Sequence, residues 1–418
     1  MLTPVIDAIC RAEGARVLAG LIRHTGDFEL AQDALQDAYA RALEVWPRQG
    51  LPDAPAAWLT TVARRRAVDL LRRRATGPVY TDEPPDLAAP EAAESEPDPA
   101  ALSGVDDDRL RLVFTCCHPA IAEPAQMALA LRTLCGLTTR EIARAFLEPE
   151  ATTAQRLVRV QRKIREARIP YEVPARELLP ERLQAVLGVV YLVFNEGYAT
   201  TADDGLVRPD LCAEAIRLGR LLVELMPDES EAAGLLALML LHDARRTTRV
   251  GPDGALVPLE EQDRSKWSRP AIDEGLALLD RALAVRRRGP YQVQAAIAAL
   301  HARAARAADT DWPQIAALYR GLVSEQPSAV IALNAAVALA MAEGPAQGLA
   351  WIERLESGGE LAGYHLLPAA RADLLRRLGR PVEAAAAYGV ALAQVRTRPE
   401  RLYLERRLRE CRGEASRS

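Results

Sequence analysis

A proline-rich acidic stretch at residues 76–108 divides the chain and constrains its fold more than any other feature of the sequence. It contains six prolines and ten aspartates or glutamates, with no lysine or arginine. Such a segment cannot bury enough apolar surface to fold by itself, so the pattern predicts an extended linker. The rest of the 418-residue chain must then form separate domains on either side, each with its own core.

The patterns on both sides of this linker predict helices. Apolar residues make up 49% of the chain and aromatic residues only 5%, while alanine, leucine and arginine recur throughout. A mixture of good helix formers with few β-branched runs favours helices over strands. We therefore predict an all-α protein. Its predicted parts are residues 1–75, the linker at 76–108, residues 109–170 and a long helical region at 175–418.

The first part contains two amphipathic helices. Apolar residues recur at helical spacing from Asp27 to Trp46, and Pro47 is expected to end this helix. The second helix is expected to begin near Pro55, because proline suits a first helical turn. The outward faces of the two helices differ in charge, since the first is acidic and the second is rich in arginine.

The third part ends in a helix-turn-helix pattern. Gly136 is expected to close one helix, and Thr138 with Glu141 forms the Thr-x-x-Glu signature of a capping box that opens the next. A short break, LEPE, precedes the basic sequence ATTAQRLVRVQRKIREAR. Such a basic second helix is typical of modules that enter the DNA major groove. The net charge of −4 does not contradict this, because local charge decides binding to nucleic acid.

The long C-terminal region has a loose helical repeat. Amphipathic helices alternate with turns that contain proline or glycine, and Tyr319, Trp351 and Tyr388 lie 32 and 37 residues apart. These spacings are close to the ~34-residue period of tetratricopeptide helix pairs. One insert without a helical pattern interrupts the array around residues 247–270. The sequence therefore predicts a helical repeat domain, a fold whose concave face suits peptides or proteins.

Other classes of protein find no support in the sequence. No apolar segment reaches the ~20 residues of a membrane-spanning helix, and the N-terminus lacks the pattern of a signal peptide. Six cysteines do not have the density of a disulfide scaffold, so we expect a cytoplasmic protein with reduced thiols. We find no glycine-rich phosphate loop, nucleophile motif or histidine-rich metal pattern, and we predict neither an enzyme nor a bound cofactor.

Cys116, Cys117, His118 and Cys135 raise the question of a metal or redox site. Adjacent cysteines rarely both bind one zinc ion, and no Cys-x-x-Cys motif is present. Helices also use cysteine as a small apolar residue. We therefore expect these residues to belong to a core, and we predict no metal site.

Two separated blocks resemble the extracytoplasmic-function sigma factors of bacterial RNA polymerase. DFELAQDALQDAYARALEVWP followed by PAAWLTTVARRRAVDLLRRRA is similar to their region 2, and TLCGLTTREIARAF with ATTAQRLVRVQRKIREAR is similar to their region 4. The resemblance implies a region 2 helical bundle over 1–75 and a region 4 helix-turn-helix over 109–170. It also implies binding to the β′ clamp and β subunit of polymerase core and promoter-specific initiation of transcription.

The acidic face of the first long helix is the candidate polymerase contact. Asp33, Asp37 and Glu44 lie on one stripe by helical spacing. The resemblance implies that this stripe binds the coiled-coil clamp of the β′ subunit. The alternative is an ordinary solvated helix face, which is the usual role of exposed acids.

The loop after this helix and the arginine-rich helix that follows are the candidate reader of a promoter −10 element. Opening promoter DNA requires a pocket for an unstacked base and cationic contacts to the backbone. Trp58 is a candidate stacking residue, although an aromatic residue at a helix start is more often part of the core. The other candidates are the base readers Arg48, Gln49 and Asp53, the phosphate binders Arg64, Arg65, Arg66 and Arg72, and Thr61 and Asp69 on the same face.

The basic helix at 151–168 is the candidate reader of a −35 element. Arg162 and Lys163 are expected to neutralise phosphates. The sequence departs from the family pattern at the preceding turn, where Leu147 replaces a glycine and Glu148 an inward aliphatic residue. The residues expected to contact base edges are Thr152, Thr153, Gln155, Arg156 and Arg159.

The remaining chain resembles the subgroup of these sigma factors that carries a tetratricopeptide-like extension, in phrases such as VVYLVFNEGYA, EEQDRSKW and GPYQVQAAIAALHA. We expect this extension to control activity, either by masking the DNA-binding helices or by contacting polymerase. A small YCII-related protein is a candidate partner. The alternative function is a helix-turn-helix regulator that acts without polymerase and uses its repeat domain to bind a protein.

Overall fold

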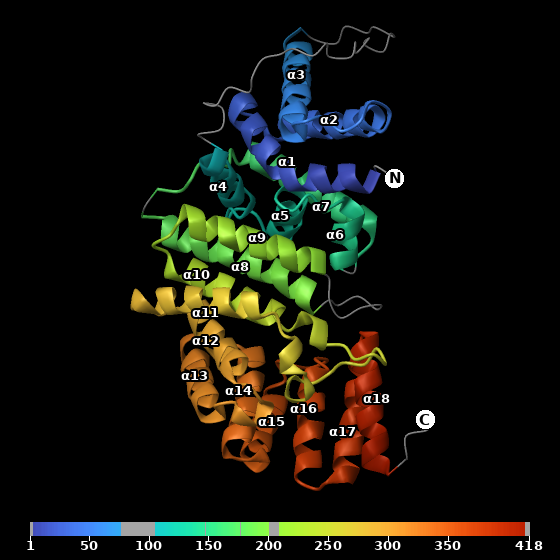
Figure 1. Cartoon of the computed structure of the whole chain (residues 1–418), viewed down its shortest axis with the longest axis vertical. Helices are drawn as coiled ribbons and strands as arrows, with labels where there is room; N and C mark the ends of the chain where they lie inside the picture. Colours follow the sequence, from blue (N-terminus) through green and yellow to red (C-terminus); the bar gives the residue numbers. More distant parts are fainter. Residues whose placement is uncertain (1–2, 77–104, 147, 176, 200–208, 414–418) are drawn as a thin grey trace. The chain divides into compact units, whose positions relative to one another are not determined.

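The computed structural model describes residues 3–76, 105–146, 148–175, 177–199 and 209–413. The chain divides into two compact units, Met1–Leu192 and Val193–Ser418. Helices are the only extended regular elements of the described residues (Figure 1), beside one isolated antiparallel bridge between Val250 and Leu256. The all-α prediction is therefore confirmed. Most of the predicted linker, 77–104, lies outside the described residues.

The first unit begins with three long helices that pack on one another and continues with four shorter ones. The three long helices are α1 (Thr3–Thr25), α2 (Phe28–Gln49) and α3 (Pro55–Thr76). The next four are α4 (Val105–Cys116), α5 (Glu123–Thr133), α6 (Thr139–Ala145) and α7 (Glu150–Glu166). Helix α1 contacts both groups, because it packs against α2 and α3 and also against α4 and α5. Helix α8 (Leu179–Tyr198) begins in this unit and ends in the second.

Helix α2 runs past the proline that was expected to end it. Pro47 lies in its last turn, and the helix ends after Gln49 with an N–H···O bond of 3.0 Å from Gly50 to Trp46. Gly50 has a φ of 89°, a conformation that glycine adopts without strain. Proline removes one backbone hydrogen bond and its ring crowds the carbonyl four residues earlier, but only two residues of α2 follow Pro47, so little of the helix depends on that turn. Arg48 and Gln49 therefore belong to the end of α2 rather than to the loop.

Helix α4 begins at Val105, so the last four residues of the predicted linker are helical. Asp108 shows the reason. From composition alone, this residue was predicted to belong to the acidic, extended linker. Its buried carboxylate lies 3.1 Å from Arg23 and 2.9 Å from Arg111. A buried acid with two cationic partners costs far less than an unpaired one, so this end of the acidic segment can fold.

The second unit consists of helices that pack mainly on their neighbours in the sequence. Its first group is α9 (Pro209–Leu225), α10 (Ser230–Asp243), α11 (Arg269–Ala284) and α12 (Pro290–Arg303). Helix α10 is apolar over most of its surface and contacts all three others. The second group is α13 (Trp312–Glu325), α14 (Ala329–Glu343), α15 (Pro345–Gly358), α16 (Leu366–Arg377), α17 (Pro381–Gln394) and α18 (Arg398–Arg412).

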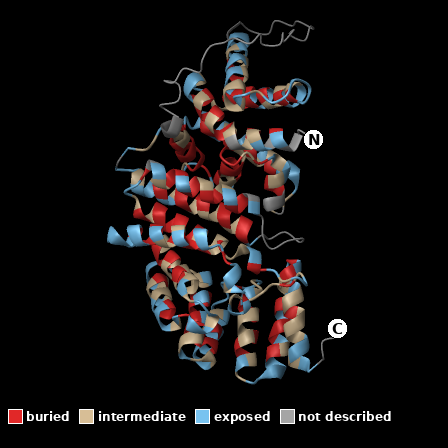
Figure 2. Cartoon of the chain, viewed as in Figure 1, coloured by how far each residue is buried: buried red, intermediate tan, exposed pale blue. Residues whose placement is uncertain are grey.

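The three aromatic residues that suggested the repeat lie on alternate helices of the second group. Tyr319, Trp351 and Tyr388 lie on α13, α15 and α17, the first helices of three successive pairs, and each helix from α13 to α18 packs against the next. Buried residues concentrate on the faces between neighbouring helices (Figure 2). The 32- and 37-residue spacings thus correspond to one helix pair each.

The insert predicted around 247–270 is compact and contains the short 3₁₀ helices η2 (Arg246–Thr248), η3 (Leu259–Glu261) and η4 (Arg264–Lys266). The indole of Trp267 donates to the hydroxyl of Thr248 at 3.1 Å, with both residues buried. The amide of Leu256 donates to the carbonyl of Pro399 at 2.9 Å, which connects the insert to the start of α18. Among the described residues, no helix has both the length and the apolar character needed to cross a membrane.

Candidate nucleic-acid interface

The three acidic residues predicted to bind polymerase are all exposed on α2. Asp33, Asp37 and Glu44 follow the spacing that places them on one helix face. Asp37 accepts a hydrogen bond of 2.5 Å from Arg66, and Glu44 accepts one of 3.1 Å from Arg41. Partial burial, together with repulsion from Glu29 and Asp37, raises the pKa of Asp33. The structure thus brings these acids together on one face, and two of them have partly exposed cationic partners.

Helix α3 presents most of its predicted DNA-binding residues to solvent. Arg66 is the exception, because its guanidinium turns toward Asp37 on α2. Thr61 donates its hydroxyl to the carbonyl of Ala57 at 2.9 Å, so its oxygen remains an acceptor. The exposed members of the set on α3 are Thr61, Arg64, Arg65, Asp69 and Arg72.

The residues between the two helices divide into an exposed group and an aromatic pair. Arg48, Gln49 and Asp53 are exposed. Trp58 is only partly buried and meets the buried Trp46 edge to face, with ring centroids 5.2 Å apart. This contact supports the packing role of Trp58.

The capping box predicted at α6 is confirmed. The amide of Thr138 donates to Glu141 at 2.7 Å, and the amide of Glu141 donates to the Thr138 hydroxyl at 3.2 Å. Glu141 also pairs with Arg11 of α1 at 2.8 Å. Partial burial opposes ionisation of Glu141, but these hydrogen bonds hold its pKa below its usual range. The cap therefore fixes the start of α6 and ties this helix to α1.

The turn between α6 and α7 depends on Glu148, one of the two residues that depart from the family pattern. Its carboxylate accepts two hydrogen bonds of 2.6 Å from Arg156 and another from the hydroxyl of Thr153. The Arg156 guanidinium also lies over the ring of Phe146, 5.4 Å from its centroid. Leu147, the other departure, lies outside the described residues.

This arrangement corrects two of the predicted base contacts. Thr153 has no exposed surface, and both hydrogen-bonding arms of Arg156 are held by Glu148. The sequence could not indicate this, because the helical period predicts only that Thr153 and Arg156 lie near the helix start. The predicted residues that remain exposed on α7 are Thr152, Gln155, Arg159, Arg162 and Lys163.

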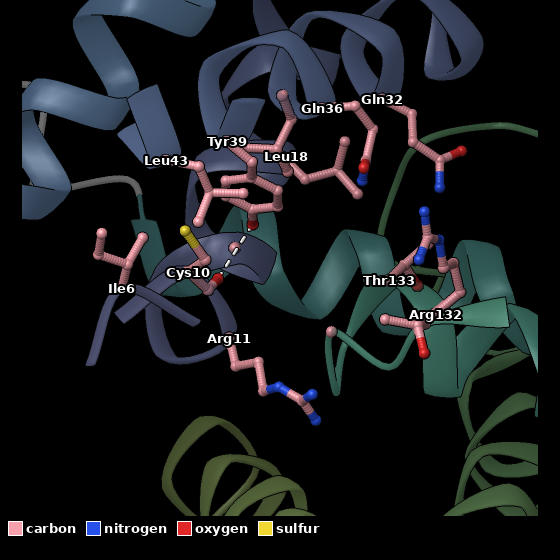
Figure 3. Close-up of a pocket in the computed structure, with 14 residues that line it drawn as sticks. Ile6, Cys10, Arg11, Leu18, Gln32, Gln36, Tyr39, Leu43, Arg132 and Thr133 are labelled. Atoms are coloured by element: carbon pink, nitrogen blue, oxygen red, sulfur yellow. Dashed lines mark hydrogen bonds between the residues drawn. The ribbon is translucent and has the colours of Figure 1, made fainter. Parts of the chain in front are cut away.

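One edge of α7 contacts α2 within the first unit. Arg165 pairs with Glu29 at 2.5 Å, and the side-chain amide of Gln161 donates to Gln32. Beside this contact lies a cleft of about 550 Å³ between α1–α2 and α5–α6. Figure 3 shows Tyr39 and Gln36 on one side of it and Arg132 on the other, with the Tyr39 hydroxyl donating to the carbonyl of Cys10 at 3.0 Å.

The cysteine cluster is part of the core of the first unit. Cys116, Cys117 and Cys135 are buried, and the thiol of Cys116 lies 3.2 Å from the Thr133 hydroxyl. Burial raises the pKa of Cys116 to about 12 and raises that of Cys117 as well, so both thiols are protonated near neutral pH. In the described part of the chain, no three histidine, cysteine or acidic residues are grouped as metal ligands would be.

The second unit contains a groove of about 850 Å³ that sequence reasoning did not locate. Its walls come from α14, α16 and the insert, and its apolar lining includes Val337, Met341 and Leu366. Arg377 also lines the groove and pairs with both Glu260 at 2.5 Å and Asp373 at 2.6 Å. The repeat spacing predicted a concave face. The position of the groove on it also depends on the fold of the insert, which the repeat pattern does not predict.

Comparison with known proteins gives two family matches. Residues 10–76 match the family sigma-70 region 2, and residues 182–283 match a family of unknown function, DUF6596. The uncharacterized protein R00370 of Rhizobium meliloti (strain 1021) is 45% identical over 406 residues, which cover 96% of this chain and 95% of that protein.

A shorter similarity connects the chain with a named protein. The probable ECF RNA polymerase sigma factor SigI of two Mycobacterium tuberculosis strains, CDC 1551 / Oshkosh and ATCC 25618 / H37Rv, is 29% identical over 181 residues. These residues make up 42% of this chain and 60% of SigI. The chain therefore belongs to one family with R00370, and its residues 10–76, together with the partial similarity to SigI, relate it to the sigma factors.

Proposed function

We propose that this protein binds RNA polymerase core and directs promoter-specific initiation of transcription. The observation that carries the proposal is the sigma-70 region 2 at residues 10–76, in which an exposed acidic face on α2 adjoins an exposed arginine-rich face on α3. A repressor or activator that acts without polymerase has no need of such a pair. The helix-turn-helix formed by α6 and α7 supplies a second DNA-binding element downstream in the chain.

The α2 face is the proposed site for the β′ clamp. Asp33, Asp37 and Glu44 are exposed, and the partners of Asp37 and Glu44 are themselves partly exposed arginines. Ion pairs of this kind contribute only about 0–1 kcal/mol, so cationic residues of polymerase can replace the internal partners at little cost. Asp33, whose carboxylate is repelled by its acidic neighbours, gains most from a new cation.

The −10 element is proposed to bind along α3 and the end of α2. Arg64, Arg65 and Arg72 are placed for phosphates, while Arg48, Gln49 and Asp53 surround the loop where an unstacked base would be held. The −35 element is proposed to bind the exposed face of α7 through Thr152, Gln155 and Arg159, with Arg162 and Lys163 on phosphates.

The second unit is proposed to be a tetratricopeptide-like regulatory domain. Its groove has the size of a ligand or peptide site, and its two arginines already have partners: Arg377 pairs with two acids, and Arg264 donates to the carbonyls of His301 and Ala304. A neutral, apolar segment suits such a lining better than an acidic one. A YCII-related protein is the proposed partner, and a protein that acts with polymerase core is expected in the cytoplasm.

Run-off transcription with purified core polymerase tests the proposal. Promoter fragments, including the region upstream of the protein's own gene, are transcribed with core alone and with core plus protein. Initiation at a defined start site only in the presence of the protein is the expected result, and D37A is expected to weaken it through loss of clamp binding. Duplex binding without initiation on any fragment would instead favour the polymerase-independent regulator.

A further inference from the structure

One ion pair joins the two surfaces that the proposed function assigns to different partners. Arg66 of α3 belongs to the predicted −10 set, and Asp37 of α2 belongs to the predicted polymerase set. The Nε of Arg66 donates to Oδ2 of Asp37 at 2.5 Å. The two side chains are 30% and 50% exposed, so a partner molecule can reach both. The pair therefore connects the polymerase surface directly with the DNA surface.

Arg66 lies at the border of the DNA-facing side of α3. On one side of it are the buried Ala63 and Ala67, where α3 packs on the neighbouring helices α1 and α2. On the other side is Asp69, a member of the exposed set. Asp69 follows Arg66 by three positions, so the two are about 60° apart around the helix. From this border the long arginine side chain can turn toward α2, as it does here, or toward the DNA-facing side.

Binding of polymerase at Asp37 competes with the Arg66 contact. Arg66 occupies one of the two carboxylate oxygens. A cationic partner binds an aspartate most strongly when it uses both oxygens, as in a bidentate arginine–carboxylate pair. Such a partner also repels the Arg66 guanidinium, because two cations then lie beside one carboxylate. Occupation of Asp37 by polymerase therefore favours release of Arg66 from α2.

We propose that Arg66 couples polymerase binding to recognition of the −10 element. Asp37 holds its guanidinium in the free protein, and Arg66 turns to the DNA backbone once polymerase core binds Asp37. The proposal rests on the function proposed above. Coupling of this kind is reciprocal, so DNA that binds Arg66 also leaves Asp37 free for polymerase. Exposed ion pairs are weak, and the expected coupling is at most about fivefold in affinity.

The first test compares the effect of R66A with and without polymerase core. The probe is a fluorescent single-stranded oligonucleotide that carries the −10 sequence of a promoter found by run-off transcription, each strand in turn. Fluorescence anisotropy measures its affinity for the free full chain and for holoenzyme. R66A is expected to weaken binding about threefold in holoenzyme and to change binding by the free chain little, because Asp37 already holds Arg66 there. R65A, at an exposed arginine of the same set, should weaken both by the same factor.

The second test releases Arg66 without polymerase. D37N removes the charge that holds Arg66, and it should raise the affinity of the free chain for the oligonucleotide about threefold. In the R66A background the same substitution should bring no gain. E29Q is the matched control, because Glu29 also lies on α2 and pairs with an arginine outside the −10 set, Arg165 of α7. It should bring no gain in either background.

The outcomes separate the failure of this proposal from the failure of the proposed function. The coupling is overturned if R66A weakens the free chain and holoenzyme by the same factor, which a purely structural role of Arg66 predicts. It is also overturned if D37N brings no gain in the free chain, or the same gain with and without Arg66. Each of these results leaves core-dependent initiation in place. If core and protein together initiate on no promoter fragment, the proposed function is wrong, and the coupling with it.

Discussion

Glu148 determines which side chains at the start of α7 remain exposed. By binding both Arg156 and Thr153, it turns two side chains at the helix start inward to the preceding turn. A sequence pattern shows which positions lie near a helix start, but it cannot show which partner a long arginine selects. The only sign of this arrangement in the sequence was the departure from the family pattern at Glu148. It indicated that the turn differs, but not that Glu148 and Arg156 form two hydrogen bonds.

Removal of this carboxylate should loosen the helix-turn-helix. In E148A, the hydroxyl of Thr153 and the Arg156 guanidinium lose their partner, and the first unit should lose about 1–3 kcal/mol of stability. Urea unfolding, followed by the fluorescence of Trp46 and Trp58 with the other tryptophans replaced by phenylalanine, measures this loss.

The matched variant T153V removes only the hydroxyl. Because Thr153 is buried, promoter affinity should stay within about twofold of wild type, well below the tenfold that corresponds to ~1.4 kcal/mol. A larger loss of affinity in folded T153V would return Thr153 to the set of base contacts.

Glu141 should make the first unit sensitive to acid. Its pKa is lowered in the folded protein by the Thr138 and Arg11 contacts. A lowered folded pKa stabilises the native state above the unfolded pKa of about 4.3, and the contribution is lost as the pH falls through the folded value. E141Q should therefore be less stable than wild type at pH 7, and the difference should shrink below about pH 4.3.

The same tryptophan-based urea titration at pH 7 and at acidic pH checks this prediction. E177Q, at an exposed glutamate in the turn before α8, serves as the control and should behave as wild type throughout. An E141Q deficit of equal size at both pH values would mean that the carboxylate charge is not what stabilises the contact.

At the scale of elements, α7 has three distinct sides. One is buried in the helix-turn-helix core, one edge contacts α2, and the third is exposed and cationic. The hydrophobic period predicted the first side and the basic composition predicted the third. The contact with α2 includes an exposed ion pair between residues 136 positions apart in the sequence. A local sequence pattern cannot predict such a pair.

The exposed side of α7 should account for part of the salt dependence of promoter binding. Each phosphate contact releases counterions, so R162A should lower the slope of log affinity against log salt by about 1 without changing sequence preference. Glu166 lies 3.4 Å from Arg162, and E166Q should therefore strengthen binding at low salt. Filter binding across a salt series measures both effects. R409A, at an exposed arginine of α18, should leave the slope unchanged.

At the scale of the whole molecule, the long apolar and repeat patterns predicted the helical content well. The end of α2 and the start of α4 were predicted less well, because each depends on a specific contact. Helix α8 begins in the first unit, where its Arg182 donates to the carbonyl of Phe114 at 2.7 Å. A truncation after residue 174 would remove this contact as well as the repeat domain. Substitutions in the groove are therefore the cleaner test of control.

V337R places a charge in the apolar groove between α14 and α16. Because an unpaired charge is costly in such surroundings, ligand binding should weaken at least about tenfold. Reporter expression in cells should therefore change, while run-off transcription with purified core should not. V390R, at an exposed valine of α17 outside the groove, is the control. A change in the purified system would indicate that the groove contacts polymerase or the rest of the chain directly.

The insert between α10 and α11 also bears on how the second unit unfolds. It contacts α18 through Leu256 and Glu261, and α16 through Glu260. A segment near the start of the helical array therefore contacts the helices at its C-terminal end. Open helical arrays lose their terminal repeats first, since each repeat interacts only with its neighbours. The contacts of the insert with α16 and α18 prevent the terminal repeats from unfolding separately. Amide exchange in α18 should then be as slow as in α10, and the array should melt as one cooperative block.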